Sequence, residues 1–167
     1  VARAAASAAF GKLGPGEAIE LAWPAGIGAE AVQLVRLSRR ADAATARKAG
    51  ATIGARLGAA GGIVLAEGIA RAADVAYGIA LRAYSFNDHK TGEQKPPGAV
   101  TVMVKAPEAV AAEAGPMAAL AEGVFFARDL VNEPANVLTT DDFAARLAAM
   151  HELGLDVEIL EEADLER

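Results

Sequence analysis

The clearest hydrophobic pattern in the chain lies between residues 123 and 150, where two helical stripes flank a break. Apolar side chains recur at the spacing of one helix face in the first stripe: Val124, Ala127, Leu130 and Val131. Pro134 cannot continue a helix and pushes Glu133 out of the helical region. The pattern therefore predicts a helix that ends near Val131 and an extended crossing over residues 134–138.

A second helix begins directly after this crossing. Thr139 is a predicted N-cap, and Asp142, three residues further on, supplies the acidic partner of a capping box. Its apolar stripe consists of Phe143, Leu147 and Met150. A long helix, a short extended crossing and a capped second helix are typical of a connector between two domains.

Elsewhere the hydrophobic period alternates between that of strands and that of helices. Strands are predicted at residues 17–23, 31–37, 63–65, 99–105 and 155–160. Helices are predicted at residues 1–10, 42–57 with Asp42 as N-cap, 69–86, 107–131 with an interruption at Gly115-Pro116, and 139–150. Residues 63–65 are wholly apolar, which is typical of a strand buried on both faces. Residues 87–98 form a predicted polar loop.

Alternation of strands and helices predicts an α/β fold with three layers and a C-terminal connector helix. The strand at 155–160 has no sheet of its own to join, since only a polar helix start follows it. We therefore divide the chain into an N-terminal α/β domain at residues 1–115, a connector helix and crossing at 116–138, and the start of a second domain at 139–167.

The composition excludes several kinds of reactive site. The chain is 53% hydrophobic and 5% aromatic, so its core is built from small aliphatic side chains. It contains no cysteine, which excludes disulfides, thiolate metal sites and a cysteine nucleophile. No run of eighteen uninterrupted apolar residues occurs, so we predict no membrane span.

Charge is unevenly distributed, with a net charge of +4 in residues 1–60 and −10 in residues 61–167. The positive charge is concentrated at Arg36, Arg39, Arg40, Arg47, Lys48 and Arg56. We interpret this cluster as a solvated surface, with an anionic partner as the alternative. No aromatic residues alternate with the basic ones, so nucleic acid is not the predicted partner.

No residue is predicted to be catalytic, to bind a cofactor or to ligate a metal. The two histidines, His89 and His151, lie far apart and lack a ligand at helical spacing, so both are predicted to be surface residues. The acidic clusters stand at predicted helix starts, where carboxylates cap amides: Asp141, Asp142, Glu161, Glu162 and Asp164.

Two glycine-rich segments and the asparagines near Pro134 are predicted to shape the backbone and not to bind a ligand. Residues 26–28 and 58–62 do not complete the Gly-x-Gly-x-x-Gly motif of a dinucleotide site, and neither opens a helix toward a phosphate. Nor does the chain contain a Gly-x-Ser-x-Gly nucleophile elbow. Asn132, Glu133 and Asn136 are predicted to hold the crossing backbone, with a place near a domain interface or substrate cleft as the alternative.

The run Arg128-Asp129-Leu130-Val131-Asn132-Glu133-Pro134-Ala135-Asn136 resembles the segment that joins the two domains of leucyl (cytosol) aminopeptidases. Residues 42–57 are similar to the alanine-rich helix of their N-terminal domain. Residues 81–91 resemble the last helix and exit loop of that domain, and residues 155–160 the first strand of the catalytic domain.

The resemblance implies a macro-domain-like mixed sheet between helices, in the non-catalytic part of a cytoplasmic enzyme. Such enzymes remove N-terminal residues from peptides with two divalent metals, zinc or manganese. The family's Asn-Thr-Asp-x-Glu-Gly-Arg block does not occur here, so the resemblance predicts no metal, no cofactor and no activity for this chain alone. The implied partners are the catalytic domain of the same polypeptide, peptide substrates and a homo-hexamer, whereas the isolated chain is expected to be monomeric or weakly associating.

Two alternatives belong to other functional classes. A free-standing macro-like module would bind ADP-ribose or a related nucleotide through a glycine-rich loop. A regulatory domain would bind DNA or another anion through the basic cluster, with steep salt dependence.

Overall fold

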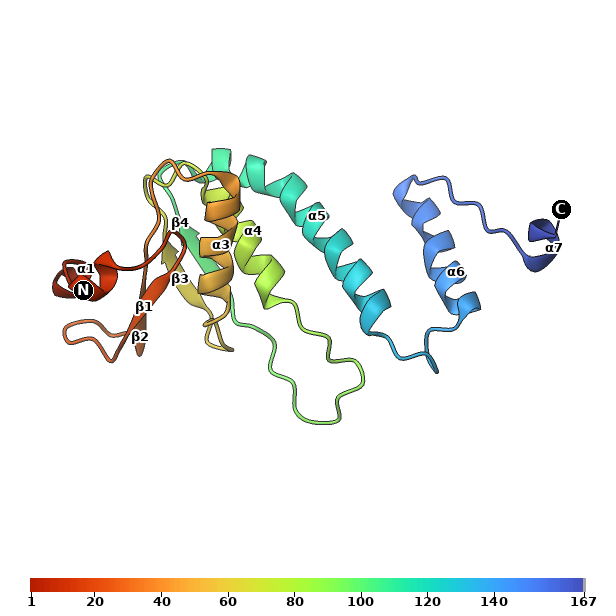
Figure 1. The fold of residues 1–167 in the computed structure, drawn as a ribbon, viewed down its shortest axis with the longest axis horizontal. Coiled ribbons are helices and arrows are strands. Elements are labelled where there is room, and N and C mark those ends of the chain that lie inside the picture. The colour runs from red at the N-terminus through yellow and green to blue at the C-terminus, as the bar shows by residue number, and fades with distance from the viewer. Residues whose placement is uncertain (167) are drawn as a thin grey trace. The chain divides into compact units, whose positions relative to one another are not determined.

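The computed structural model describes residues 1–166, which form two compact units at residues 1–125 and 126–167 (Figure 1). The first unit is a mixed α/β structure with two small sheets and helices. The second unit is helical. The predicted α/β class is confirmed at this level.

The chain begins with two short helices, α1 (Ala2–Ala5) and α2 (Ala8–Gly11), where the sequence predicts one helix over residues 1–10. The single-helix prediction is wrong because the Ser7 side chain accepts a hydrogen bond from the Phe10 amide at 3.2 Å and starts a new helix.

The first sheet is an antiparallel hairpin of β1 (Ala18–Ala22) and β2 (Ala31–Val35), with Ala18 opposite Val35 and Ala22 opposite Ala31. In the turn that joins the two strands, Trp23 adopts a positive φ of 48° and is exposed. Both strands were predicted from their alternating pattern.

The second sheet pairs β3 (Gly62–Leu65) with β4 (Val100–Met103) in parallel. Parallel neighbours require a crossover, which α4 (Ala72–Ala83) provides. Along the chain, α3 (Ala43–Gly54) lies between β2 and β3, and it starts where Asp42 accepts the Thr45 amide at 2.7 Å. The predicted N-cap at Asp42 is therefore confirmed.

Helices α3 and α4 lie against each other and form the centre of the first unit (Figure 1). Their shared surface consists of small residues, and Ala46 and Ala49 have no exposed area. At Gly50 and Gly78 no Cβ would fit, because it would overlap the backbone of the opposite helix. Ala46 also belongs to a core cluster with Val75 and Ile79.

Residues of the second sheet alternate between a half-buried and an exposed face. Val64 and Val100 pack against the core cluster, whereas Ile63 and Leu65 are 70% and 76% exposed. The prediction that residues 63–65 are buried on both faces is wrong for the described residues. Helices cover one face of this sheet, and alternation is the pattern of a strand buried on one face only.

Helix α5 (Pro107–Asn132) is continuous through Pro116, where the sequence predicts an interruption. That prediction is wrong, because Pro116 lies between alanine-rich turns whose helical preference is strong enough to continue on both sides. Only Ala121 of this helix is buried. By length and hydropathy α5 could cross a membrane, but core helices of water-soluble proteins also have this length and composition.

The second unit contains the end of α5, α6 (Thr140–Ala148), the 3-10 helix η1 (Ala149–Leu153) and α7 (Glu162–Leu165). Residues 155–160 form no strand, so that prediction is wrong for the described chain. Their alternating pattern suits a strand, but a strand is stable only beside a partner, and the residues described after 125 contain none.

Candidate functional site

The connector between α5 and α6 carries the most distinctive sequence of the chain. After α5 the backbone makes a tight turn, in which the amides of Val137 and Leu138 both donate to the Pro134 carbonyl at 2.9 Å. The prediction of an extended crossing over residues 134–138 is therefore wrong, because these local hydrogen bonds close a turn. Glu133 is buried to 95% at its side chain and accepts from the Arg146 guanidinium of α6 at 3.5 Å. The connector is thus joined to α6 by an ion pair, in addition to the covalent chain.

Helix α6 starts with the predicted capping box. The Thr139 hydroxyl accepts from the Asp142 amide at 3.3 Å, and the Asp142 carboxylate accepts from the Thr139 amide at 3.2 Å. Hydrogen bonds from the Thr139 side chain and backbone lower the pKa of Asp142 below its usual value of 3.8. Asp42 at the start of α3 also has a lowered pKa, through bonds from Thr45.

A lowered pKa in the folded state makes stability depend on pH. The cap at Asp42 contributes fully above the unfolded pKa, near 3.8, and is lost as pH falls through the lower folded pKa. We expect Asp42→Asn to retain the cap without titrating, so that stability falls less steeply between pH 4 and 2 than in the wild type. Urea unfolding across this range measures the slope. Asp156→Asn, at a carboxylate without a hydrogen bond in residues 1–166, should leave it unchanged.

Residues 1–166 contain no group of three side chains that could hold a metal ion. The ring of His89 lies 5.6 Å from that of Phe86, and a ring nitrogen of His151 lies 3.0 Å from the Val157 carbonyl oxygen. The two histidines are thus placed in different units. A dinuclear metal centre does not fit the residues described here.

The remaining acidic candidates lie at helix starts. Asp141 and Asp142 stand in the first turn of α6, and Glu161 forms a second capping box with Asp164 at the start of α7. Glu162 belongs to the same first turn. The contacts of Asp142, Glu161 and Asp164 are those of helix caps.

Half of the basic cluster is engaged in contacts within the fold. Arg36 donates to the carbonyls of Gly11, at 2.9 Å, and Leu13. Arg56 lies 3.6 Å from the carboxylate of Glu20. The third residue of this half is Arg47, which binds a buried carboxylate.

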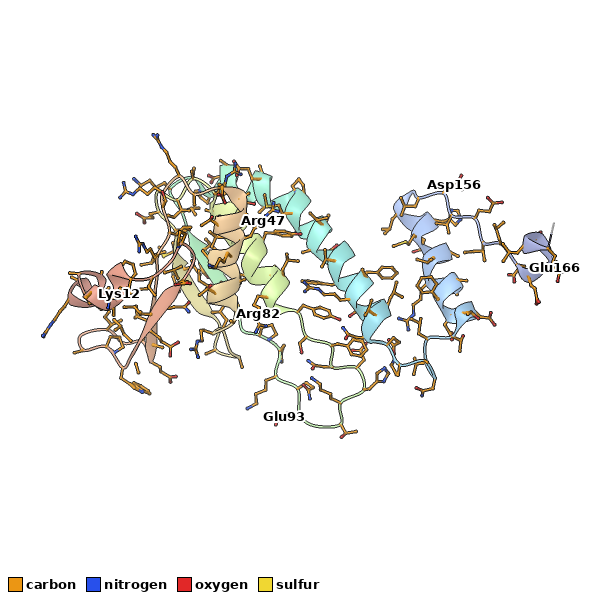
Figure 2. All side chains as sticks on the ribbon, viewed as in Figure 1. Lys12, Arg47, Arg82, Glu93, Asp156 and Glu166 are labelled. Atoms are coloured by element: carbon orange, nitrogen blue, oxygen red, sulfur yellow. The ribbon has the colours of Figure 1, made fainter. Side chains whose placement is uncertain are left out.

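That partner, Asp74, was not singled out from the sequence. Its side chain is only 4% exposed and binds Arg47 at 2.8 Å and Arg71 at 3.3 Å. Arg47, which is labelled on α3 in Figure 2, also lies 5.1 Å from the ring centre of Tyr77. A carboxylate in the first turn of a mostly apolar helix was the available signal, because such a residue is buried only when it is paired. Asp74 joins α3 to α4.

The glycine-rich segments also have structural roles. Residues 26–28 lie in the turn between β1 and β2. The Gly58 carbonyl accepts from the amides of Gly61 and Gly98, both at 3.1 Å, and Gly62 donates to the Ala99 carbonyl at 3.0 Å. Residues 58–62 therefore bind the chain that leads into β4 through the Gly58 carbonyl and the Gly62 amide, whereas the Gly61 amide is engaged within the segment.

A hollow of about 530 Å³ lies in the first unit between the ends of α3 and α4 and the start of β4. Its lining is mostly small and apolar, including Ala76, Ala80 and Val102, with Arg82 and Ser85 at its polar side. A second hollow of about 500 Å³ lies beside Arg36, Arg40 and Asp42. Neither contains a pair of titratable groups arranged for acid–base catalysis.

No protein-family model matches the chain. Among curated proteins, it is 72% identical over 165 residues to a probable cytosol aminopeptidase of Cereibacter sphaeroides, a match that covers 99% of this chain and 34% of the relative. The corresponding protein of Dinoroseobacter shibae is 50% identical, over 100% of this chain and 34% of the relative. That of Methylorubrum extorquens is 38% identical, over 98% and 35%. The chain therefore spans about a third of the length of these relatives.

Solved structures agree with this similarity. The bottromycin maturation enzyme BotP superposes with a TM-score of 0.68 at 31% identity, over 91% of this chain and 35% of that one. A structure of BotP in complex with Mn gives a TM-score of 0.67 at 32% identity, over 91% and 34%. The fold of the described residues is thus similar to part of a larger enzyme.

Proposed function

Since the chain belongs to the cytosol aminopeptidase family, as the counterpart of the N-terminal third of its members, we propose that it is the non-catalytic N-terminal portion of a leucyl aminopeptidase. The whole enzyme would be a hydrolase that removes N-terminal residues from peptides. The observation that carries this proposal is 72% identity across almost the entire chain. The absence of any metal-ligand group in residues 1–166 supports a role outside the chemistry.

We propose that the metals are bound by the part of the polypeptide outside these residues. Two divalent ions, zinc or manganese, would there activate water and polarise the scissile carbonyl. The structure of BotP with Mn supports manganese. The residues described here supply no step of that reaction, so their contribution is the placement and assembly of the catalytic domain.

The domain organisation follows the same proposal. Residues 1–115 would be the N-terminal domain, 116–138 the connector and 139–167 the start of the catalytic domain. The N-terminal domain would be a three-layer, macro-like sandwich, which the parallel β3–β4 pair and its helices support. The boundary between compact units at residues 125 and 126 falls within the proposed connector. A homo-hexamer in the cytoplasm, without nucleic acid or membrane, completes the proposal.

Hydrolysis of leucine amide tests the proposal. We expect the full-length protein to release leucine with Mn²⁺ or Zn²⁺ and to lose this activity with a chelator, whereas residues 1–167 alone release none above the metal blank. A full-length protein that cleaves no peptide or amide under either metal would refute the aminopeptidase function. Release of leucine by residues 1–167 alone would refute the non-catalytic role of this portion.

A further inference from the structure

The hollow of about 530 Å³ in the first unit, called the α3–α4 hollow below, has walls from three elements. The end of α3 forms one wall, and β4 contributes Val100 and Val102. The lining side chains of α4 include Ala76, Ala80 and Ala83, whose methyl groups fill little of the space between helix and strand. The volume lies within the range of small-molecule sites, about 300–1,000 Å³.

Two glycines hold these walls at fixed positions. A Cβ at Gly54 would lie 3.0 Å from both the Arg82 Cβ and the Ile79 carbonyl oxygen, so the end of α3 lies directly against α4. At Gly98 a Cβ would overlap the Gly61 amide nitrogen, so the segment before β4 is held equally closely. The hollow is therefore preformed, and a ligand that enters it has little chain to order.

Among the described residues, Arg82 is the one charged side chain that lines the α3–α4 hollow, in the last turn of α4 (Figure 2). It is exposed and forms no ion pair or hydrogen bond within residues 1–166. The Ser85 hydroxyl at the same edge donates to the Asn87 side-chain oxygen at 2.9 Å, so its proton is engaged. A guanidinium binds a carboxylate through two parallel hydrogen bonds, so this edge favours an anionic group on an apolar ligand.

We propose that the α3–α4 hollow is a binding site for a small carboxylic acid with a compact apolar tail. The tail would contact the alanines of α4 and the valines of β4, and the carboxylate would pair with Arg82. A short fatty acid and a free apolar amino acid share this chemistry. The inference goes beyond the proposed function, since the site supplies no step of hydrolysis.

The second hollow, beside Arg36 and Arg40, lacks this combination. Arg36 already donates to the carbonyls of Gly11 and Leu13, and the Asp42 carboxylate lines the same space. A carboxylate ligand would therefore meet a like charge there. This contrast makes Arg40 a matched control for Arg82.

Hydrogen exchange of the full-length protein tests the site with probes of similar size. Isocaproate and L-leucine both carry the carboxylate, whereas isocaproamide is neutral. At ten times its half-saturating concentration, a bound acid should slow amide exchange in residues 79–85 and 98–102 by roughly 10-fold, because the open state that exchanges does not bind it. The neutral amide should leave these residues unchanged.

Each pattern of protection has one interpretation. Protection by isocaproate alone would assign the site to a fatty acid, protection by leucine alone would assign it to an amino acid, and either supports the proposal, as does protection by both. No protection by either acid would overturn it, as when another part of the polypeptide fills the hollow. Equal protection by isocaproamide would also overturn it, because Arg82 would then not select the ligand.

Variants test the two halves of the site. Arg82→Gln should raise the half-saturating concentration of the bound acid at least about 10-fold, since it removes a charge-assisted pair. Ala80→Leu should abolish protection, because the longer side chain would occupy the hollow. Should this variant fail to fold, Arg82→Gln, at an exposed position, still decides the question. Arg40→Gln should leave binding unchanged, and an equal loss there would refute the assignment.

Activity separates this inference from the proposed function. Leucine bound at an active site outside residues 1–167 would protect other segments of the protein, so the local readout is specific to the α3–α4 hollow. An active peptidase without protection at the hollow would refute this inference alone. An inactive protein with a protected hollow would refute only the proposed function.

Discussion

Gly50→Ala is expected to destabilise the protein by about 2–4 kcal/mol. A Cβ at this position would overlap the carbonyl oxygen of Val75 and lie 2.9 Å from the amide nitrogen of Ile79. Both atoms belong to the backbone of α4, which cannot rotate aside as a flexible side chain would. The two helices must move apart, and the surrounding core must loosen with them. Urea unfolding of the variant measures the loss.

Gly123→Ala is the matched control for this substitution. Gly123 lies within α5, and nothing lies within 4 Å of the position that its Cβ would occupy. Alanine should therefore stabilise this helix by roughly 0.5–1 kcal/mol through its higher helical propensity. If Gly50→Ala were as well tolerated as Gly123→Ala, the close approach of α3 and α4 would be wrong.

Gly61→Ala should cost about 3 kcal/mol for a different reason. Gly61 has a φ of +70°, and a Cβ there would overlap the Ala99 carbonyl oxygen and lie 2.8 Å from the Ala99 nitrogen. The substitution would separate residues 58–62 from the segment that leads into β4, and the 3.0 Å bond from Gly62 to Ala99 would break. Thermal unfolding should show a lower midpoint.

A second glycine separates the two causes of this loss. Gly26 has a similar φ of +76°, but nothing lies within 4 Å of its Cβ position. Gly26→Ala therefore carries only the backbone cost of a left-handed conformation, about 1–2 kcal/mol. The difference between the two variants reports the steric overlap at Gly61, and a difference near zero would contradict it.

Features that depend on neighbouring residues were predictable from the sequence. Asp42 and Thr139 cap helices through bonds that span three residues, so both the cap and the helix start could be located. The connector motif likewise placed the helix end and the family, but residues 134–138, which were expected to be extended, form a turn at Pro134. Ser7 carries the same kind of signal three residues before Phe10, and it starts a second short helix where the apolar pattern predicts one continuous helix.

Features that depend on distant partners were not predictable. The strand pattern at residues 155–160 describes a strand only if a sheet lies beside it, and no such sheet is among the described residues. The sequence also cannot show that Asp74 would meet Arg47, 27 residues away, because that contact exists only after α3 and α4 pack. The exposure of Ile63 was unpredictable for the same reason. It depends on which faces of β3 are covered by other elements, and an apolar pattern alone does not show this.

The glycine contacts between α3 and α4 also have a consequence for motion. Side chains that separate two helices usually allow them to slide by small rotamer changes, but backbones in direct contact leave no such layer to deform. The pair should therefore move as one rigid body, together with the strands that it covers. Motions on the microsecond to millisecond scale should then be largest outside this helix pair. We expect them in the hairpin turn around Trp23 and in the long loop between α4 and β4.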